Sequence, residues 1–180
     1  MNIVLVVGNP KPGSRTLTVG RAVADQVGRM CATQHHVTTL DLVDIGHDLL
    51  NSKSATVLQA LRTVQDADLL VVASPTYRGT YSGLLKLFFD QANSHEFRGR
   101  PAIPVMIGGD RRHALAVEVL LRPLLVEVGA VIPTRGLFVC ESDLESLDQL
   151  VESWSREATA ALTPHMFESP DSTAISDPRG

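Results

Sequence analysis

The stretch that decides the fold lies at the amino end, where an apolar run leads into a loop rich in glycine and proline. It reads Ile3-Val4-Leu5-Val6-Val7-Gly8-Asn9-Pro10-Lys11-Pro12-Gly13-Ser14-Arg15-Thr16. Residues 3–7 are continuously apolar and mostly β-branched, which is typical of a strand buried on both faces of a parallel sheet. Two prolines and a glycine then predict a loop, and Ser14 or Thr16 can cap a helix that runs to about Met30.

The same order of strand and helix repeats along the chain. The apolar pattern predicts further strands over residues 36–42, 69–73, 102–107 and 131–140, and further helices over residues 55–65, 82–93, 112–128 and 142–162. Strands that alternate with helices indicate β–α–β units, so we expect an α/β fold with a doubly wound, five-stranded parallel sheet of order 2-1-3-4-5. One domain is expected over residues 1–162, followed by a flexible tail over residues 163–180 that is rich in Pro, Ser and Asp.

Length and composition narrow the class of protein. The chain has 180 residues, of which 44% are hydrophobic and 20% charged, as in a single globular domain. A net charge of −4 gives no reason to expect a nucleic-acid partner, no segment is apolar enough to span a membrane, and the six His have no metal-ligand spacing. The amino end lacks the features of a signal peptide, and Cys31 and Cys140 are expected to be reduced, so we expect a cytoplasmic protein.

In a doubly wound sheet, ligands bind beyond the carboxyl ends of the strands, where the strand order reverses. This places three loops side by side, over residues 8–16, 74–81 and 108–113. The first loop precedes a helix whose unpaired amides and dipole attract an anion. Its two hydroxyls and two cations predict a phosphate monoester site, formed by Lys11, Ser14, Arg15 and Thr16. The loop matches neither the Walker A pattern nor G-x-G-x-x-G, and an ordinary capped loop is the alternative.

The second loop holds both tyrosines of the chain. It reads Ser74-Pro75-Thr76-Tyr77-Arg78-Gly79-Thr80-Tyr81-Ser82-Gly83. Pro75 stiffens the backbone, so a flat ring could lie against Tyr77 with the charge of Arg78 near it. The alternative is that the tyrosines only pack the loop. On the following helix, Lys86 and Asp90 are spaced for an ion pair.

The third loop reads Gly108-Gly109-Asp110-Arg111-Arg112-His113. Two glycines after a strand let a backbone approach a ligand closely. Arg111 and Arg112 could meet a nucleotide phosphate, or they could be solvated surface residues. His113 could contact the ligand, or it could be structural.

These motifs resemble those of the NAD(P)H-dependent FMN reductases of flavodoxin-like fold. The best likeness is to the reductases that supply reduced FMN to two-component monooxygenases, such as those of alkanesulfonate use. The likeness covers about residues 1–139. It rests on residues 8–16, on residues 74–77 with 81–86, and on Gly108-Gly109 with residues 113–117.

The resemblance implies a set of cofactors and contacts. FMN would be reduced by NADPH or NADH, with its phosphate held by Ser14, Arg15 and Thr16; Asn9 and Lys11 stand where the family often has Ser and Arg. The isoalloxazine would be lined by Pro75, Thr76, Tyr77 and Arg78, and its other edge would be closed by Gly108 and Gly109. A homodimer or dimer of dimers, with a flavin-dependent monooxygenase as partner, is also implied. Val119 lies near the place where the sulfonate-type reductases can carry a Tyr or His.

Three functions remain open on the sequence. The first is a reductase that releases reduced FMN. The second is a flavoprotein that keeps FMN bound and reduces quinones, azo compounds or metal oxyanions. The third is a flavodoxin-like electron carrier without nicotinamide turnover, although the low acidic and aromatic content near the loops is unlike a flavodoxin. No side chain is predicted to act as a nucleophile or general acid, because the flavin carries the chemistry.

Overall fold

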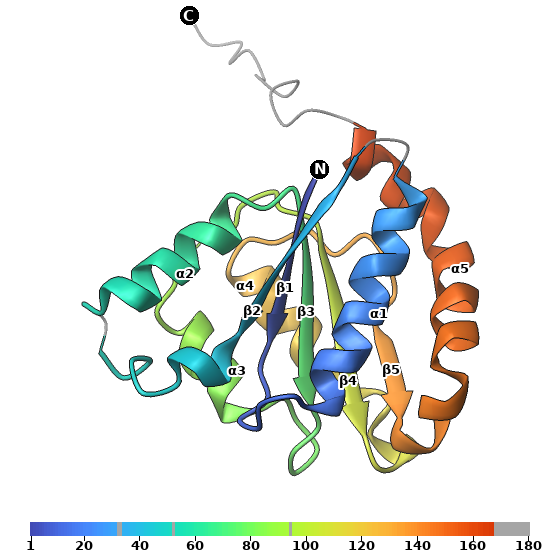
Figure 1. The fold of residues 1–180 in the computed structure, drawn as a ribbon, viewed down its shortest axis with the longest axis horizontal. Helices are drawn as coiled ribbons and strands as arrows, with labels where there is room; N and C mark the ends of the chain where they lie inside the picture. Colours follow the sequence, from blue (N-terminus) through green and yellow to red (C-terminus); the bar gives the residue numbers. More distant parts are fainter. Residues whose placement is uncertain (32–33, 52, 94, 168–180) are drawn as a thin grey trace, which may run out of the picture.

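The computed structural model describes residues 1–31, 34–51, 53–93 and 95–167. Most of the expected tail, residues 168–180, lies outside this described part. Five strands form one parallel sheet: β1 (Asn2–Val7), β2 (His36–Asp41), β3 (Leu69–Pro75), β4 (Ala102–Gly108) and β5 (Leu137–Cys140). Their order is β2-β1-β3-β4-β5, which confirms the predicted flavodoxin-like arrangement (Figure 1).

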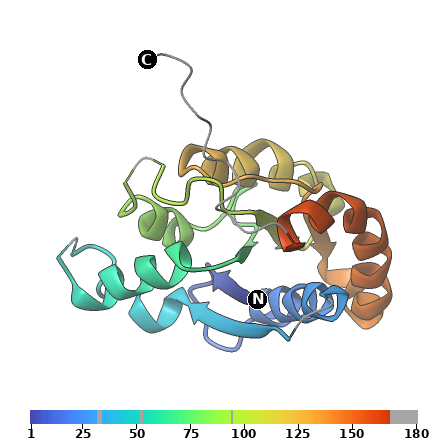
Figure 2. The ribbon, with the colours of Figure 1, turned by 90° about the horizontal axis from the view of Figure 1, so that it is seen from above.

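Helices cover both faces of the sheet (Figure 2). One face carries α1 (Arg15–Met30) and α5 (Leu147–Phe167), and the other carries α2 (Ala55–Gln65), α3 (Gly83–Phe89) and α4 (Arg122–Glu127). The alternation of side chains along β1 supplies both layers, because Ile3, Leu5 and Val7 pack towards α1 and α5 while Val4 and Val6 pack towards the other helices. Residues 3–7 are fully buried, as their unbroken apolar run predicts.

The helix predicted over residues 112–128 is confirmed over residues 116–127, but it is not a regular α-helix from end to end. The chain instead forms a 3₁₀ turn at Arg111–His113, a π-helical turn at Val117–Leu121 and then the short α4. Pro123 explains the break, since it has no amide hydrogen for the carbonyl of Val119 and its ring crowds that carbonyl. The preceding turn widens, so that the Arg122 amide donates to the Val117 carbonyl five residues earlier.

Three other elements have ends that differ from prediction. Helix α3 stops at Phe89 rather than residue 93, and the chain continues in tighter turns. Strand β5 is confined to Leu137–Cys140, because the Ile132 and Thr134 carbonyls before it accept from the Arg122 guanidinium instead of joining the sheet. Helix α5 starts after a 3₁₀ turn at Glu141–Ser146 and continues to Phe167, so residues 163–167 are helical.

Candidate functional site

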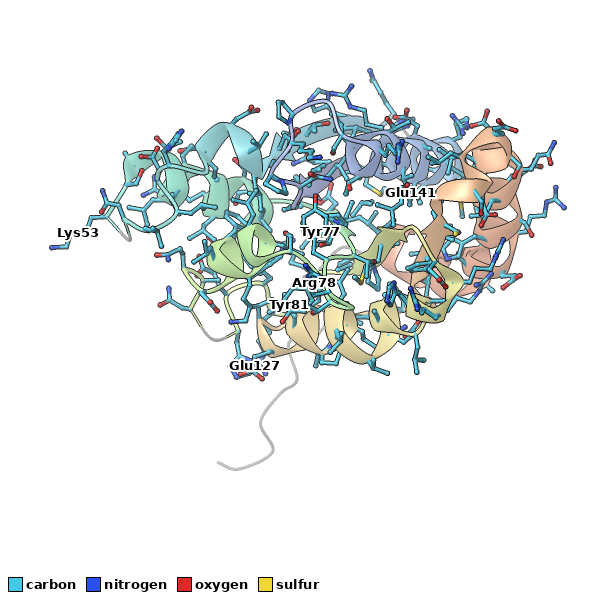
Figure 3. All side chains as sticks on the ribbon, turned by 90° about the horizontal axis from the view of Figure 1, so that it is seen from below. Lys53, Tyr77, Arg78, Tyr81, Glu127 and Glu141 are labelled. Atoms are coloured by element: carbon cyan, nitrogen blue, oxygen red, sulfur yellow. The ribbon has the colours of Figure 1, made fainter. Side chains whose placement is uncertain are left out.

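The loops that follow β1, β3 and β4 lie along one edge of the sheet, as the strand order predicts. Figure 3 looks onto this edge, with Tyr77 and Arg78 near its centre and Glu141 to one side. The three predicted loops are therefore brought together by the parallel ladder that joins β1 to β3 and β3 to β4.

The first loop ends in an exposed helix terminus. Ser14 is the N-cap of α1, and its hydroxyl oxygen accepts a hydrogen bond of 3.2 Å from the Leu17 amide. Gly13 enters the helix with a φ of +61°, a left-handed conformation that favours glycine. Within the described chain, the amides of residues 13–16 donate to no acceptor. Four free amides at the positive end of a 16-residue helix supply the donors that the predicted anion site requires.

The side chain of Asn9 holds this loop in shape through hydrogen bonds. Its buried amide nitrogen donates to the Thr16 hydroxyl at 2.8 Å, and its carbonyl oxygen accepts from the Lys11 amide at 3.0 Å. The Tyr77 hydroxyl lies 3.5 Å from the same oxygen. Asn9 and Thr16 are buried, so they shape the loop from inside, whereas the Lys11 side chain is exposed.

Arg15 has a partner that the sequence analysis did not foresee. Its Nη1 lies 2.6 Å from Oε2 of Glu141, the first residue after β5. The two residues are 126 positions apart, and no local pattern connects them. The structure thus adds the chain after β5 to the three predicted loops.

The second loop contains a tight turn at residues 77–80. The Tyr77 amide donates to the Thr80 carbonyl at 2.9 Å, and the Thr80 amide returns a bond of 3.2 Å. Arg78 and Gly79 have φ values of +54° and +83°, which is the signature of a type I′ turn. A left-handed arginine costs roughly 1 kcal/mol, and such strain concentrates at functional positions. The Tyr77 and Thr80 amides donate within the turn. Among residues 77–80, the amides of Arg78 and Gly79 are therefore the ones without a described acceptor.

Thr76 carries a buried hydroxyl with no hydrogen-bond partner among the described residues. Its neighbour Gly108 is closely packed, because a Cβ there would lie 3.1 Å from the Thr76 hydroxyl oxygen and 3.0 Å from the Phe138 ring. The adjoining Gly109 is exposed, and a Cβ there would meet no described atom within 4 Å. A buried polar atom left unpaired beside open backbone fits the polar edge of a bound ring.

Two buried serines join the first loop to the second. The Ser82 hydroxyl donates to the Gly8 carbonyl and accepts from the Leu85 amide at 3.1 Å, while the Ser82 amide donates to the Ser74 hydroxyl at 2.9 Å. Gly8 permits this approach, since a Cβ there would lie only 2.6 Å from the Leu85 Cβ. Ser82 could be read as a helix cap, but its bond to Gly8 needed the tertiary structure.

The cations of the third loop are already paired. Arg111 lies 2.6 Å from Asp143, and Arg112 lies 3.2 Å from Asp110. His113 is half-buried in the 3₁₀ turn. On α3, the predicted ion pair between Lys86 and Asp90 is present.

Two features are absent from the described residues. These residues contain no group of three or more His, Cys, Asp or Glu that could hold a metal ion. They also contain no helix that is long and apolar enough to cross a membrane.

Comparison with known sequences decides the family. The sequence profile described as NADPH-dependent FMN reductase matches residues 1–145. The chain belongs to this family of FMN reductases. It is 35% identical over 149 residues to an FMN reductase (NADPH) of Pseudomonas aeruginosa, covering 80% of this chain and 79% of that protein. It is 33% identical over 148 residues to the NADH-dependent FMN reductase SfnF of Pseudomonas fluorescens, covering 79% and 78%.

A solved structure agrees with this family. The apo form of an NADH:FMN oxidoreductase (EMOB) superposes with a TM-score of 0.72 at 25% identity, covering 85% of this chain and 87% of that one. The resemblance drawn from the loops is thus confirmed, together with FMN and a reduced nicotinamide nucleotide as the cofactors of this FMN reductase. The free amides at the amino end of α1 are donors of the kind that a phosphate such as that of FMN would require.

Proposed function

We propose that this FMN reductase binds FMN as an exchangeable substrate, reduces it with NADPH or NADH, and releases it to a flavin-dependent monooxygenase. The observation that carries this proposal is the exposure of the candidate site. Residues 10–13 and Arg78 are exposed, and Tyr77 is 42% exposed, so the described chain leaves the flavin edge open to solvent. An open edge suits a ligand that must enter and leave in each turnover. The resemblance to reductases of two-component monooxygenases supports the choice of partner.

The first loop would hold the phosphate of FMN. The amides of residues 13–16 and the Ser14 hydroxyl lie at the amino end of α1. Lys11 and Arg15 are the nearby cations. Asn9 and Thr16 would act by holding the loop in shape, because their side chains bond to each other.

The second and third loops would hold the ring. Pro75, Thr76, Tyr77 and Arg78 would line one side of it, and Gly108-Gly109 would close the other edge, with His113 beyond them. The free amides of Arg78 and Gly79, together with the Arg78 guanidinium, would stabilise negative charge on the pyrimidine end of the ring.

The bound flavin supplies the redox chemistry by accepting a hydride from the nicotinamide. The protein has to keep one face of the ring accessible and orient the nicotinamide against it. The accessible face of the ring would lie near Tyr77, which is exposed, and near Arg111 and Arg112, which are paired with carboxylates.

We also infer that the FMN reductase is a homo-oligomer, a dimer or a dimer of dimers, and that it works in the cytoplasm. Three apolar side chains near the π-helical turn support the first inference, because Leu115, Val119 and Val126 are 66%, 52% and 53% exposed. The two cysteines, both free, support the second.

The test is a comparison of acceptors with purified protein. NADPH and NADH oxidation are followed at 340 nm while FMN, riboflavin, a quinone or an azo dye is varied, and flavin is assayed after gel filtration. We expect the protein to elute without flavin and its rate to saturate with added FMN. Retained flavin with a rate that saturates in the quinone or azo dye would favour the bound-cofactor alternative, and no oxidation with either nucleotide would favour the electron carrier.

A further inference from the structure

The segment after β5 restrains the arginines of two predicted loops. Glu141 holds Arg15 of the phosphate loop, and Asp143 holds Arg111 of the loop after β4, each at 2.6 Å. Among the described residues, Lys11 and Arg78 are the loop cations without such a partner. The Glu141 carboxylate is therefore already paired with Arg15, the arginine that would contact the phosphate of FMN.

The pair between Arg15 and Glu141 is weak enough to yield. Both side chains are largely exposed, at 64% and 47%, and only one guanidinium nitrogen makes the contact. Exposed pairs of this kind contribute little stability, whereas a phosphate dianion beside free helix amides can engage the same guanidinium through two nitrogens. The phosphate can thus take Arg15, but Glu141 remains beside it as a like charge.

Two opposing effects of Glu141 can be ranked. Orienting Arg15 would favour FMN, but an exposed pair gives only a small orienting effect. Repulsion between the carboxylate and a phosphate that contacts the same Arg15 would act on up to two negative charges, at a separation below the Debye length of about 10 Å, where salt screens it incompletely. Repulsion is therefore the larger effect.

We propose that Glu141 is a positioning residue that weakens FMN binding, by competing for Arg15 and repelling the phosphate, and so keeps the flavin exchangeable. This inference rests on the proposed function, and it assigns to one residue the loose binding that flavin release requires. Riboflavin has no phosphate, so its affinity should not depend on Glu141.

The test measures flavin affinity rather than turnover. The dissociation constants of FMN and riboflavin are obtained from quenching of flavin fluorescence by the full-length wild type, Glu141→Gln and Glu141→Asp. Glu157→Gln is the matched control, because Glu157 of α5 forms an exposed pair at 2.7 Å with Arg135, which precedes β5 and belongs to none of the three loops.

We expect Glu141→Gln to bind FMN about three- to tenfold more tightly at low salt, with a smaller gain at about 0.5 M NaCl. Glu141→Asp, which keeps the charge, and Glu157→Gln should stay close to the wild type, and riboflavin should be unaffected throughout. Unchanged or weaker FMN binding by Glu141→Gln, or equal tightening of riboflavin, would overturn the role of Glu141 and leave the proposed function intact. A wild type that binds neither flavin would refute the proposed function itself and this inference with it.

Discussion

At the scale of single residues, Thr76 is the most informative member of the candidate site. Its hydroxyl is buried without a described partner and packs against Gly108, while the adjoining Gly109 has open space beside it. Most buried polar atoms in native proteins are hydrogen-bonded, so an unpaired hydroxyl next to the candidate site makes Thr76 a residue to test. The sequence could place Thr76 in the loop, but the isolation of its hydroxyl is a tertiary property.

Replacing Thr76 by Val should separate stability from binding. Valine keeps the shape and removes the unpaired hydroxyl, so the free energy of unfolding should stay constant or rise by up to about 1 kcal/mol. The dissociation constants of FMN and riboflavin should both rise roughly two- to tenfold, because a hydrogen bond to the ring is lost. Urea unfolding and fluorescence titration measure the two quantities.

Thr134 provides the control for this experiment. Its hydroxyl is also buried without a described partner. Thr134 precedes the amino end of β5, however, whereas the three loops lie at the carboxyl ends of the strands. Thr134→Val should resemble Thr76→Val in stability and leave flavin affinity unchanged. If both variants altered flavin affinity equally, the assignment of Thr76 to the ring would fail.

At the scale of elements, a polar clamp holds the π-helical turn to the chain before β5. Glu118 accepts from Arg122 at 2.6 Å and from the Gly136 amide at 2.5 Å, while Arg122 donates to the carbonyls of Ile132 and Thr134 at 3.1 Å and 2.6 Å. The hydrogen bond from Arg122 is the main reason that the pKa of Glu118 lies below its ordinary value, with the Gly136 amide adding to it against the effect of burial. The clamp compensates for the backbone bonds that this irregular region lacks.

Glu118→Gln should therefore lower the free energy of unfolding by about 1 to 2 kcal/mol at pH 7. Because the folded pKa lies below the unfolded one, the carboxylate stabilises the wild type fully above the unfolded pKa, and this contribution is lost as the pH falls through the folded pKa. Urea unfolding from pH 7 to 3.5, followed by the buried Trp154, should show the two proteins converging in acid.

The control is Glu152→Gln, which breaks an exposed pair with Arg156 on α5. It should change stability by less than about 0.5 kcal/mol at all these pH values. A gap between wild type and Glu118→Gln that stayed constant down to pH 3.5 would show that charge is not the source of the clamp's stability.

At the scale of the whole molecule, exposed apolar side chains indicate where two copies would meet. Leu115, Val119 and Val126 belong to the π-helical turn and its neighbours, on the face of the sheet that carries α4. The substitution Leu115→Lys places a charge in this surface, so it should shift the protein from an oligomer towards the 19.4 kDa monomer. Light scattering coupled to gel filtration measures the mass.

Leu50→Lys is the matched variant, because Leu50 is 82% exposed but lies between β2 and α2. It should keep the mass of the wild type. Monomeric wild-type protein, or dissociation by Leu50→Lys alone, would contradict this location of the interface.

The sequence by itself determined the strands, their order and the three loops. Continuous apolar runs such as residues 3–7 can only be buried on both faces, and parallel strands with helical crossovers then bring the loops after β1, β3 and β4 to one edge. The loop residues and their likeness to a family predict FMN without the tertiary structure. Pro123 in the sequence also predicts an irregularity in the helix over residues 112–128, whereas the apolar spacing taken alone predicts a regular one.

Only the tertiary structure decided which polar groups from distant parts of the chain meet. The pairing of Arg15 with Glu141 and the bond from Ser82 to Gly8 join segments that are far apart in the chain, and the isolation of the Thr76 hydroxyl also depends on how such segments pack. Burial of apolar side chains is non-directional and leaves a period in the sequence, whereas a hydrogen bond or ion pair depends on atoms within about 3 Å. That proximity is set by packing of the whole sheet, so it leaves no local pattern to read.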